Sequence, residues 1–532
     1  MSSNLLISLS DNIVIDKTKC IFCGICVDTC ITDNLRLLMA PCRHACPLQT
    51  NCQGYVQAVA RGDMALALRL VHGKLPFPAI LGRVCPHPCE ASCTRRETDG
   101  QAVAIREIKR FIADQVSAAD YPAPKPAKST GKTIAVVGAG PAGVLAAYDL
   151  ALRGHDVRLY DAESKPGGML RWAIPSFRLP EETLDKELGQ LEQLGVRFWG
   201  SRVLGRELSL DRLEADHDAV VVAIGCGSPK ELAGFEANGE DIHYGLPFLR
   251  AHRHSEAPGI GKSVLVVGGG NVAIDAARTA RRRGADTVRL VCLEGREEMP
   301  AYPWEAQAAE AEGVEIQYGL GPVTLRREGG SLSGVTCQPC VSLWDDQGEF
   351  APRLDTGSES FLEADTVIVA IGQKVDEDLL GRAGLDTDVD PFSLQLGEEP
   401  VFLAGDLFSG PMSVVEAMAS GRRAAESAHR FVMGKHMRHG RAYAGPILTD
   451  FDADTSGAVA RARAKPRHRG GAAEDFRQAD DTLDPETARK EAERCHSCGK
   501  PVGFYRTCWF CLPCEVECPQ DALWVEVPYL LR

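Results

Sequence analysis

The chain contains Gly138-Ala139-Gly140-Pro141-Ala142-Gly143, which follows the apolar run Thr133–Val137 and opens a helical pattern over 144–152. A second turn of the same design, Gly268-Gly269-Gly270-Asn271-Val272-Ala273, follows the apolar run Ser263–Val267. Glycines between a strand and a helix let the backbone approach a pyrophosphate, whose charge the amides at the helix N-terminus stabilise. Ala273 in place of the last glycine is an allowed variant. The two turns therefore predict two Rossmann-type dinucleotide sites.

Each turn is followed by a second predicted strand that leads to an acidic residue. The strand over 157–160 leads to Asp161, and the strand over 288–291 leads to Glu294. A carboxylate at this position accepts hydrogen bonds from the hydroxyls of a ribose. We expect Asp161 and Glu294 to contact the two dinucleotides in this way.

Length and composition indicate a multidomain chain: 532 residues leave room for about three to four domains of ordinary size. A formal net charge of −14 argues against nucleic acid or an anionic membrane as the main partner, and no apolar stretch is long enough to span a bilayer. The first residues lack the basic start of a signal peptide, so a cytoplasmic protein is expected. In that compartment, 20 cysteines at short spacings predict metal clusters instead of disulfides.

Cysteine runs at both ends of the chain have the spacing of a [4Fe-4S] ferredoxin loop. The N-terminal run comprises Cys20, Cys23, Cys26 and Cys30, with Ile31 where a proline is usual. The C-terminal run comprises Cys508, Cys511, Cys514 and Cys518, followed by the usual Pro519. Zinc competes as the ligand of any one CxxC pair, but runs of four with this spacing favour iron and sulfur. A strand over 522–527 is expected to close a ferredoxin-type fold.

Further cysteines predict additional cluster ligands, and a helical pattern over 55–71, interrupted by Gly62, predicts a helical hairpin that brings them together. These cysteines are Cys42, Cys46, Cys52, Cys85, Cys89, Cys93, Cys495 and Cys498. Four others, Cys226, Cys292, Cys337 and Cys340, lie in the nucleotide-binding part. Of these, the Cys337-x2-Cys340 pair is the alternative candidate for a redox-active dithiol.

Several motifs resemble the glutamate synthase small-subunit family, and the resemblance runs from about Cys42 to Val432. The relatives of this family include the flavin-nicotinamide half of dihydropyrimidine dehydrogenase and the large subunit of the NADH-dependent ferredoxin:NADP oxidoreductase. The matching stretches are Gly-Arg-Val-Cys-Pro-His-Pro-Cys-Glu (82–90), Ala-Ile-Arg-Glu-Ile-Lys-Arg-Phe (104–111), Gly-Gly-Met-Leu with Ile-Pro-Ser-Phe-Arg-Leu-Pro (167–180) and Gly-Gly-Gly-Asn-Val-Ala-Ile-Asp-Ala-Ala-Arg (268–278).

The resemblance implies an α/β fold with two Rossmann-like domains, in which an NAD(H) domain interrupts an FAD domain. An N-terminal helical iron-sulfur domain precedes them, and ferredoxin-like segments stand at both ends. The implied order is a ferredoxin-like cysteine run (1–35), the helical iron-sulfur domain (36–128), the first part of the FAD domain (129–260), the NAD(H) domain (261–363), the second part of the FAD domain (364–435), a linker (436–490) and a ferredoxin-like [4Fe-4S] segment (491–532).

The family pattern also implies how FAD is bound. Asp406, in Ala404-Gly405-Asp406, would contact the ribityl chain, and a helix beginning near Ser413 would direct its N-terminal amides at the flavin pyrimidine and stabilise the reduced flavin. The complete predicted cofactor-binding set for FAD and nicotinamide is Gly138, Gly140, Pro141, Ala142, Gly143, Asp161, Gly168, Met169, Gly268, Gly270, Asn271, Val272, Glu294, Gly372, Gly405, Asp406, Ser413 and Val414.

One departure from the family pattern concerns the nicotinamide cofactor. NADP-using relatives carry an arginine pair where this chain has Leu293-Glu294. An acid at that point repels a 2′-phosphate and suits a free ribose diol, so we expect NADH in preference to NADPH. The alternative is that Arg281, Arg282 and Arg283 bind the phosphate of NADPH. Without such a role, three cations at the C-terminus of a helix are expected to be solvated and to match the helix dipole.

A second departure concerns the cluster ligands. Dihydropyrimidine dehydrogenase uses a glutamine or glutamate ligand near the position of Lys109, and an ammonium group cannot coordinate iron. Cys46, Cys85 and Cys89 would then share a cluster with Cys52, while Cys42 and Cys93 would join thiolates of the run over 20–30. Alternatively, the two terminal runs are halves of one split ferredoxin, each lending its fourth cysteine to the other's cluster. The pairing stays open, with three to four clusters in all.

Nicotinamide transfers a hydride and a cluster transfers one electron, so a flavin must stand between them. No side chain is needed as acid, base or nucleophile, and no catalytic residue is predicted. We therefore expect an NADH-dependent electron-transfer subunit that passes electrons to or from a partner enzyme or ferredoxin in a hetero-oligomeric complex. The alternatives are an NADPH-dependent glutamate synthase small subunit, a disulfide reductase that uses Cys337 and Cys340, and a non-catalytic redox sensor or cluster scaffold.

Overall fold

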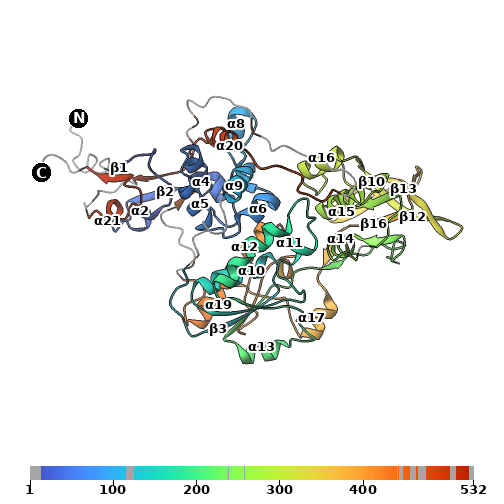
Figure 1. Ribbon diagram of the computed structural model, residues 1–532, viewed down its shortest axis with the longest axis horizontal. Helices are drawn as coiled ribbons and strands as arrows, with labels where there is room; N and C mark the ends of the chain where they lie inside the picture. Colours follow the sequence, from blue (N-terminus) through green and yellow to red (C-terminus); the bar gives the residue numbers. More distant parts are fainter. Residues whose placement is uncertain are drawn as a thin grey trace. The chain divides into compact units, whose positions relative to one another are not determined.

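The computed structural model describes residues 13–115, 125–237, 239–256, 258–439, 441, 447–453, 455, 463–464, 475–503, 508 and 511–526. The chain forms two compact units (Figure 1). The first, called here the iron-sulfur unit, comprises Met1–Pro122, Lys435–Arg467 and Thr482–Arg532. The second, the nucleotide unit, comprises Ala123–Gly434 and His468–Asp481. The two ends of the chain therefore belong to the same unit.

The nucleotide unit contains two five-stranded parallel sheets, which confirms the predicted α/β class. The first sheet has the order β18-β6-β3-β4-β5, with strands Val401–Leu403, Ala219–Val222, Thr133–Val137, Asp156–Tyr160 and Arg197–Trp199. The second has the order β11-β10-β9-β16-β8, with strands Val314–Gln317, Thr287–Val291, Ser263–Val267, Thr366–Val369 and Ile242–Tyr244. Central strands such as β6 are buried throughout, as expected of apolar runs in parallel sheets that are covered on both faces.

Helices pack on these sheets and carry the nucleotide turns. Helix α10 (Pro141–Leu152) follows β3, and α15 (Asn271–Arg282) follows β9. Helix α19 (Val414–Val432) packs along α10 and belongs to the first sheet's domain. The remaining helices of the unit are α11 (Met169–Trp172), α12 (Glu181–Gln193), α13 (Leu210–Asp216), α14 (Gly245–Arg253), α16 (Pro303–Ala311), α17 (Glu377–Ala383) and α18 (Asp406–Ser409).

An antiparallel sheet is attached to the second nucleotide domain. It contains β12 (Leu320–Glu328), the long β13 (Ser331–Trp344), β14 (Phe350–Leu354) and β15 (Ser360–Glu363), with β13 paired to each of the others. A short ribbon of β7 (Ser228–Pro229) and β17 (Gln373–Lys374) lies beyond the parallel sheets. The chain thus leaves the first sheet after β6, completes the second and returns to the first with β18.

A buried ion network joins the first nucleotide domain to the second. Arg178 donates to Asp275 on α15 and to Glu305 on α16, at 2.6 and 2.8 Å. Arg282, whose side chain is 0% exposed, donates to both oxygens of Glu312, which is also 0% exposed. The guanidinium of Arg282 lies over the ring of Phe177. These pairs fix the two domains of this unit to each other through the predicted family motif around Phe177.

The iron-sulfur unit has a helical core that includes the predicted hairpin. Helices α4 (Cys52–Ala60) and α5 (Met64–His72) are separated by a turn at Gly62, which confirms the helical hairpin predicted over 55–71. The other helices of this core are α3 (Pro41–His44), α6 (Pro78–Val84), α7 (Pro88–Ala91), α8 (Arg95–Asp99), α9 (Ile105–Asp114) and α20 (Pro485–Ala492). Helix α20 packs on α4 and α9, so a C-terminal segment completes the N-terminal helical core.

Two small sheets bring the ends of the chain together (Figure 1). Strand β1 (Ile13–Ile15) pairs antiparallel with β21 (Leu523–Val525), which confirms the closing strand predicted near the C-terminus. Strand β2 (Leu35–Leu38) pairs with β19 (Ile447–Leu448) and with β20 (Lys500–Gly503). Short helices α2 (Ile25–Asp28) and α21 (Pro513–Val516) contact each other beside these strands. The described parts of the segment over 436–490 therefore contribute a strand and a helix to the iron-sulfur unit.

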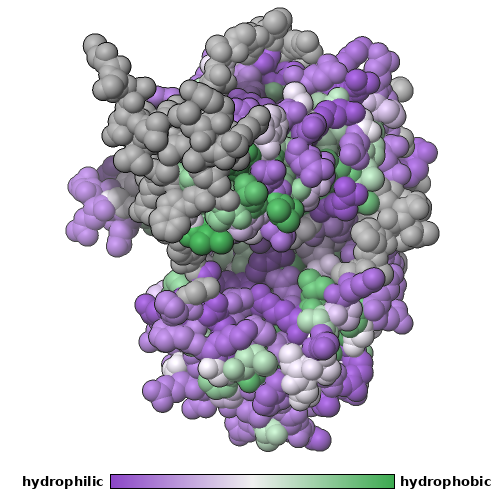
Figure 2. All heavy atoms as spheres, turned by 90° about the vertical axis from the view of Figure 1, so that its left-hand side faces the viewer, coloured by the Kyte–Doolittle hydropathy of each residue, from purple (hydrophilic) through white to green (hydrophobic). Residues whose placement is uncertain are grey.

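Apolar side chains are exposed on α2 and α21. Ile31, just after α2, is 72% exposed, and Val516, on α21, is 77% exposed. Figure 2 shows patches of apolar side chains on the face of the molecule that it displays, among a mostly hydrophilic surface. Within the described residues, no helix is both long and apolar enough to cross a membrane.

Candidate cofactor sites

The first glycine turn sits between β3 and α10 and needs glycine at its first position. Gly138 has φ of +99°, and a Cβ there would lie 2.3 Å from the carbonyl oxygen of Ala223. Asp161, after β4, accepts hydrogen bonds from the backbone N–H groups of Ala139 and Glu163. Burial raises the pKa of the Asp161 carboxyl, and the hydrogen bonds from Ala139 and Glu163 partly oppose this shift. Asp161 thus holds the turn in shape, while the second lone pairs of its oxygens can still accept from a ribose.

A cavity of about 360 Å³ opens in front of this turn. A Cβ on Gly140 would meet no protein atom closer than 4.0 Å, so the turn faces open space where a pyrophosphate could approach. Ten residues of the predicted set line the cavity: Gly138, Gly140, Pro141, Ala142, Asp161, Gly168, Met169, Gly405, Asp406 and Val414. This lining fits FAD.

Three further residues of the predicted set do not line the cavity. Gly143 lies against the carbonyl of Gly138, Gly372 lies beside the side chain of Lys230, and Ser413 is the N-cap of α19. The Ser413 hydroxyl and the Glu416 side chain form a capping box, which fixes the start of α19 next to Val414 in the cavity wall. Lining residues that the sequence did not indicate include Glu163, Trp172, Cys226, Arg250 and Met412. No local motif marks them, because the tertiary fold brings them together from separate helices and loops.

Asp406 and the N-terminus of α19 form the polar end of the cavity. Burial raises the pKa of Asp406 to about 6, although the Met412 N–H donates to its carboxylate and opposes the shift. A carboxyl group near this pKa is suited to a hydrogen bond with a polyol hydroxyl. The amides at the start of α19 supply the partial positive charge that a reduced flavin would require.

The second turn repeats this design in the other nucleotide domain. A Cβ on Gly269 would lie 2.7 Å from the Glu294 carboxylate, and a Cβ on Gly270 would meet no atom within 4 Å. Glu294 therefore lies against the turn, and the turn faces open space. The Asn271 side chain accepts from the Tyr302 N–H at 3.1 Å and braces the start of α15. At Gly268, as at Gly138, a side chain would not fit, because a Cβ there would lie 2.3 Å from the Ala370 carbonyl oxygen.

The three arginines at the end of α15 are engaged with the protein. Arg282 is buried in the ion network, Arg281 donates to the carbonyls of Glu312 and Ala285, and Arg283 donates to the Pro258 carbonyl. The expectation of a solvated helix end is therefore wrong for Arg282. Glu312, at the end of α16, contacts Arg281 and Arg282, whereas Arg283 contacts the segment before β9. These contacts reduce the case for a phosphate site there.

Four thiols and one ammonium group gather between α4, α6, α7 and α9. The Cys52 thiol is hydrogen-bonded to Cys46 and Cys89, and Cys85 is close enough to both Cys46 and Cys89 to interact electrostatically. Burial alone would lower the pKa of Lys109, but the thiolates of Cys85, Cys89, Cys46 and Cys52 raise it above its ordinary value. Lys109 thus places a cation beside the thiols.

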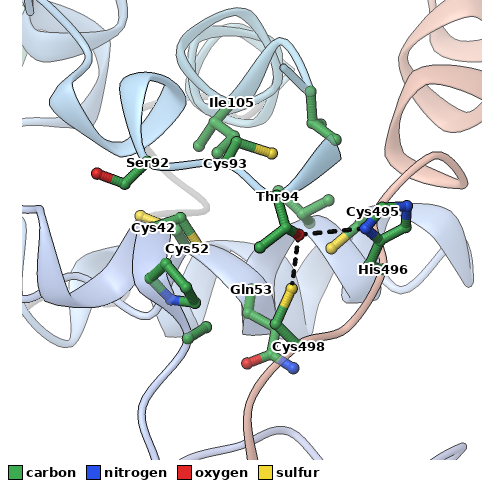
Figure 3. A pocket seen from close by; sticks show the side chains of 14 residues that line it. Cys42, Cys52, Gln53, Ser92, Cys93, Thr94, Ile105, Cys495, His496 and Cys498 are labelled. Atoms are coloured by element: carbon green, nitrogen blue, oxygen red, sulfur yellow. Dashed lines mark hydrogen bonds between the residues drawn. The ribbon is translucent and has the colours of Figure 1, made fainter. Parts of the chain in front are cut away.

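A second set of thiols lines a hollow around the start of α3 (Figure 3). The set consists of Cys42, Cys93, Cys495 and Cys498. Cys52 also lines the hollow. The structure differs here from the expectation that Cys42 and Cys93 join the run over 20–30. Antiparallel pairing of Leu38 with Lys500 brings the Cys495-x2-Cys498 pair to Cys42, and neither segment reveals this pairing by itself.

The hollow also contains hydrogen-bonding groups that sequence analysis did not indicate. The Thr94 hydroxyl lies 3.1 Å from the Cys498 sulfur and 3.1 Å from Nδ1 of His496. Burial, together with the Arg95 guanidinium, lowers the pKa of His496. Gln53 donates to the Gly499 carbonyl at 2.8 Å and holds the C-terminal segment in place.

The two terminal runs exchange their fourth cysteines. Cys518 shares a hollow with Cys20, Cys23 and Cys26. Cys514 interacts with Cys30, Cys508 and Cys511. This is the split-ferredoxin arrangement that stood among the alternatives. No three His, Cys, Asp or Glu side chains within the described ranges converge on one point as the ligands of a single ion would. The thiols instead surround hollows, and sets of four fit the separate corners of a [4Fe-4S] cluster.

The Cys337-x2-Cys340 pair has a structural position that argues against a dithiol. Both residues lie on β13, and successive side chains of a strand alternate between its faces, so residues three apart point to opposite sides. Cys337 is 0% exposed in the core, whereas Cys340 points to the Ser342 carbonyl.

We expect Cys340→Ser to retain full flavin reduction by nicotinamide, because Cys337 lies on the opposite face of β13. Stopped-flow absorbance of the variant beside the unaltered protein checks this. A loss of more than half of the rate, with unchanged FAD content, would restore the disulfide-reductase alternative.

Two parallel-sheet domains with glycine turns, a cavity shaped for FAD and sets of four thiols define a flavin-dependent pyridine-nucleotide oxidoreductase with iron-sulfur clusters. Residues 132–421 match the family described as pyridine nucleotide-disulphide oxidoreductase, and residues 9–121 match dihydropyrimidine dehydrogenase domain II, 4Fe-4S cluster. The chain belongs to this family, in the glutamate synthase small-subunit group that the motifs indicated. FAD and iron-sulfur of the [4Fe-4S] type are its cofactors.

Three similar proteins represent the relatives. The NADP(+)-dependent formate dehydrogenase subunit beta of Moorella thermoacetica is 35% identical over 509 residues, which are 86% of this chain and 70% of that protein. The NAD-dependent dihydropyrimidine dehydrogenase subunit PreT of Escherichia coli K12 is 31% identical over 74% of this chain and 92% of its own. The glutamate synthase [NADPH] small chain of Mycobacterium tuberculosis is 32% identical, over 78% and 88%. Both NAD and NADP users therefore occur among the relatives.

Proposed function

We propose that the chain is an NADH-dependent electron-transfer subunit with four [4Fe-4S] clusters, which exchanges electrons with a partner subunit or ferredoxin. When bound, FAD accepts a hydride from the nicotinamide as two electrons and releases them singly to clusters. The observation that carries the proposal is the grouping of 16 cysteines into four sets of four in one unit. The sets are Cys46, Cys52, Cys85 and Cys89; Cys42, Cys93, Cys495 and Cys498; Cys20, Cys23, Cys26 and Cys518; and Cys30, Cys508, Cys511 and Cys514.

The four sets follow one another through the iron-sulfur unit. Cys52 is hydrogen-bonded to Cys42 as well as to Cys46, which joins the first two sets. Arg43, next to Cys42, donates to the Phe22 carbonyl at 3.0 Å, and Phe22 lies between Cys20 and Cys23. The third and fourth sets share the terminal ferredoxin-like fold. Side chains thus connect each set to the next, as a file of one-electron carriers requires.

The preference for NADH rests on Glu294. Its carboxylate lies against the second glycine turn, where the adenosine ribose of a dinucleotide would bind. The following cation, Arg296, faces Glu310 at 3.3 Å, and the arginines at the end of α15 are engaged elsewhere. A carboxylate accepts hydrogen bonds from a ribose diol and repels a phosphate.

The exposed apolar side chains support a partner on the ferredoxin-like fold. Ile25 is exposed on α2, and Ile31, Leu512 and Val516 are exposed close in sequence to Cys30, Cys511 and Cys514 of the fourth set of thiols. Exposed apolar patches of this kind mark interaction surfaces. The relatives named as a subunit beta, a subunit and a small chain are consistent with such a partner.

The test is an anaerobic stopped-flow reduction of the cluster-loaded protein with NADH or NADPH, followed at flavin and cluster wavelengths. We expect NADH to bleach the flavin first and the clusters afterwards. Glu294→Gln should narrow the NADH-to-NADPH ratio of second-order rate constants by about tenfold, the effect of about 1.4 kcal/mol. Glu297→Gln, an exposed residue of the same loop, is the control with the same charge change.

Each other outcome has a meaning. Faster reduction by NADPH would overturn the NADH preference and favour a glutamate synthase type of subunit. Reduction by neither nucleotide, in protein with full FAD content, would favour the redox sensor or scaffold.

A further inference from the structure

Thr94 has an unusual position for a helix N-cap. It begins α8 directly after Cys93, and threonine at an N-cap ordinarily accepts a hydrogen bond from a backbone N–H of the first turn. Thr94 makes no such bond. Its hydroxyl instead points into the hollow of the second thiol set, toward Cys498 and His496 (Figure 3). The hydroxyl therefore has a role other than capping.

The protonation of His496 follows from its neighbours. Nε2 of His496 lies 3.0 Å from a terminal nitrogen of Arg95. A guanidinium group only donates, so Nε2 must accept. Because Nε2 accepts, it carries no hydrogen, and the hydrogen of the ring is therefore on Nδ1. Nδ1 therefore donates to the Thr94 oxygen, 3.1 Å away.

The hydrogen of the Thr94 hydroxyl is then available for one partner, the Cys498 sulfur at 3.1 Å. A second argument gives the same direction, because a cysteine that binds iron is a thiolate and has no hydrogen to donate. Donation to a charged acceptor is stronger than donation between neutral groups. The two arguments are independent, and both make Thr94 the donor and Cys498 the acceptor.

Buried ion pairs hold this chain of hydrogen bonds in place. Arg95 donates to Asp99 at 2.7 Å, and their side chains are only 5% and 4% exposed. Arg494, just before the Cys495 ligand, donates to the same carboxylate at 3.1 Å. Because Asp99 anchors both cations, Arg95 stays fixed against His496, and the histidine tautomer stays fixed with it.

We infer that Thr94 donates a hydrogen bond to the Cys498 sulfur and thereby raises the reduction potential of the cluster bound by Cys42, Cys93, Cys495 and Cys498. Reduction adds negative charge to a cluster, and a hydrogen bond to a ligand sulfur stabilises the more negative state. Thr94 is a positioning residue that acts through Cys498. The inference rests on the proposed function, since it requires a cluster at this set of thiols.

The experiment is a potentiometric titration, followed by electron paramagnetic resonance, of the FAD- and cluster-loaded full chain. Thr94→Val keeps the shape of the side chain and removes the hydroxyl. We expect it to lower the potential of one cluster, so that its reduced-to-oxidised ratio at a fixed potential falls by about tenfold, which corresponds to about 59 mV for a one-electron couple. Thr94→Ser, which keeps the hydroxyl, should restore the original potential.

A matched control and a cluster-ligand variant keep the outcomes separate. Thr98→Val makes the same change one turn away, where the hydroxyl lies 3.4 Å from Nε2 of His496, so all potentials should stay unchanged. Cys498→Ala should remove one cluster signal. If Cys498→Ala loses that signal but Thr94→Val leaves every potential unchanged, the inference about Thr94 is overturned and the proposed cluster site stands. Retention of every cluster in Cys498→Ala overturns the proposed cluster site.

Discussion

Replacing both Cys495 and Cys498 with alanine is expected to remove one [4Fe-4S] cluster from the N-terminal helical core, about four iron atoms per chain. In sequence, these two thiols lie more than 400 positions after Cys42 and Cys93. Thr94, next to Cys93, and Cys498 are 404 positions apart. The two thiols that remain, Cys42 and Cys93, are too few to hold a four-iron cluster. Iron and sulfide analysis, with electron paramagnetic resonance after dithionite reduction, measures the loss.

FAD content is the internal control for this double variant, because every residue that lines the FAD cavity belongs to the nucleotide unit. FAD should stay bound while iron falls. Cys340→Ser, which removes a thiol from an antiparallel strand of that unit, should lose no iron. The double variant would contradict the assignment if its iron content equalled that of the unaltered chain. Loss of the same signal on removing Cys518 instead would also contradict it, because Cys518 lies with a different set of thiols.

Gly143→Ala is expected to abolish FAD binding. A Cβ at this position would lie 1.7 Å from the carbonyl oxygen of Gly138, within the same glycine turn. Either α10 must withdraw or the turn must open, and forced overpacking of this kind costs about 1–3 kcal/mol or more. Because the turn is the surface that faces the pyrophosphate, we expect FAD occupancy to fall at least about tenfold. Absorbance of the purified protein near the flavin bands measures it.

Gly270→Ala is the matched control in the second turn. A Cβ there meets no atom within 4 Å, so the protein should fold with its full FAD content. The residue that corresponds to Gly143 in the second turn is already alanine, Ala273, and it is 0% exposed. Full FAD occupancy in Gly143→Ala would contradict this prediction, because it would mean that the backbone of the turn shifts enough to make room for the added methyl group. Nicotinamide reactivity then distinguishes a shifted flavin from an undisturbed one.

Local patterns were enough to predict the nucleotide-binding elements. The predicted strands over 133–137 and 263–267 coincide with β3 and β9, and the helices that follow the two turns are α10 and α15. A strand, a glycine turn and a helix are contiguous in sequence, and their geometry depends on residues only a few positions apart. The helical hairpin around Gly62 was predictable for the same reason.

The roles of several charged residues depended on contacts that sequence does not contain. Asp161 braces its own turn through Ala139 and Glu163, a use of the carboxylate beyond the expected ribose contact. Arg282 is buried against Glu312, although three consecutive arginines indicated a solvated helix end. A buried charge requires a partner, and that partner can come from any element that packs against it.

Sequence by itself determined that this chain binds two dinucleotides and has the cysteine spacings of iron-sulfur clusters, because both signals reside in short contiguous stretches. Only the tertiary structure decided which cysteines stand together. Pairing of β2 with β20 brings Cys498 to Cys42, and pairing of β1 with β21 brings Cys518 to the run that begins at Cys20. The physical reason is that a cluster requires four thiols around one small volume, and backbone pairing between distant strands sets which thiols share it.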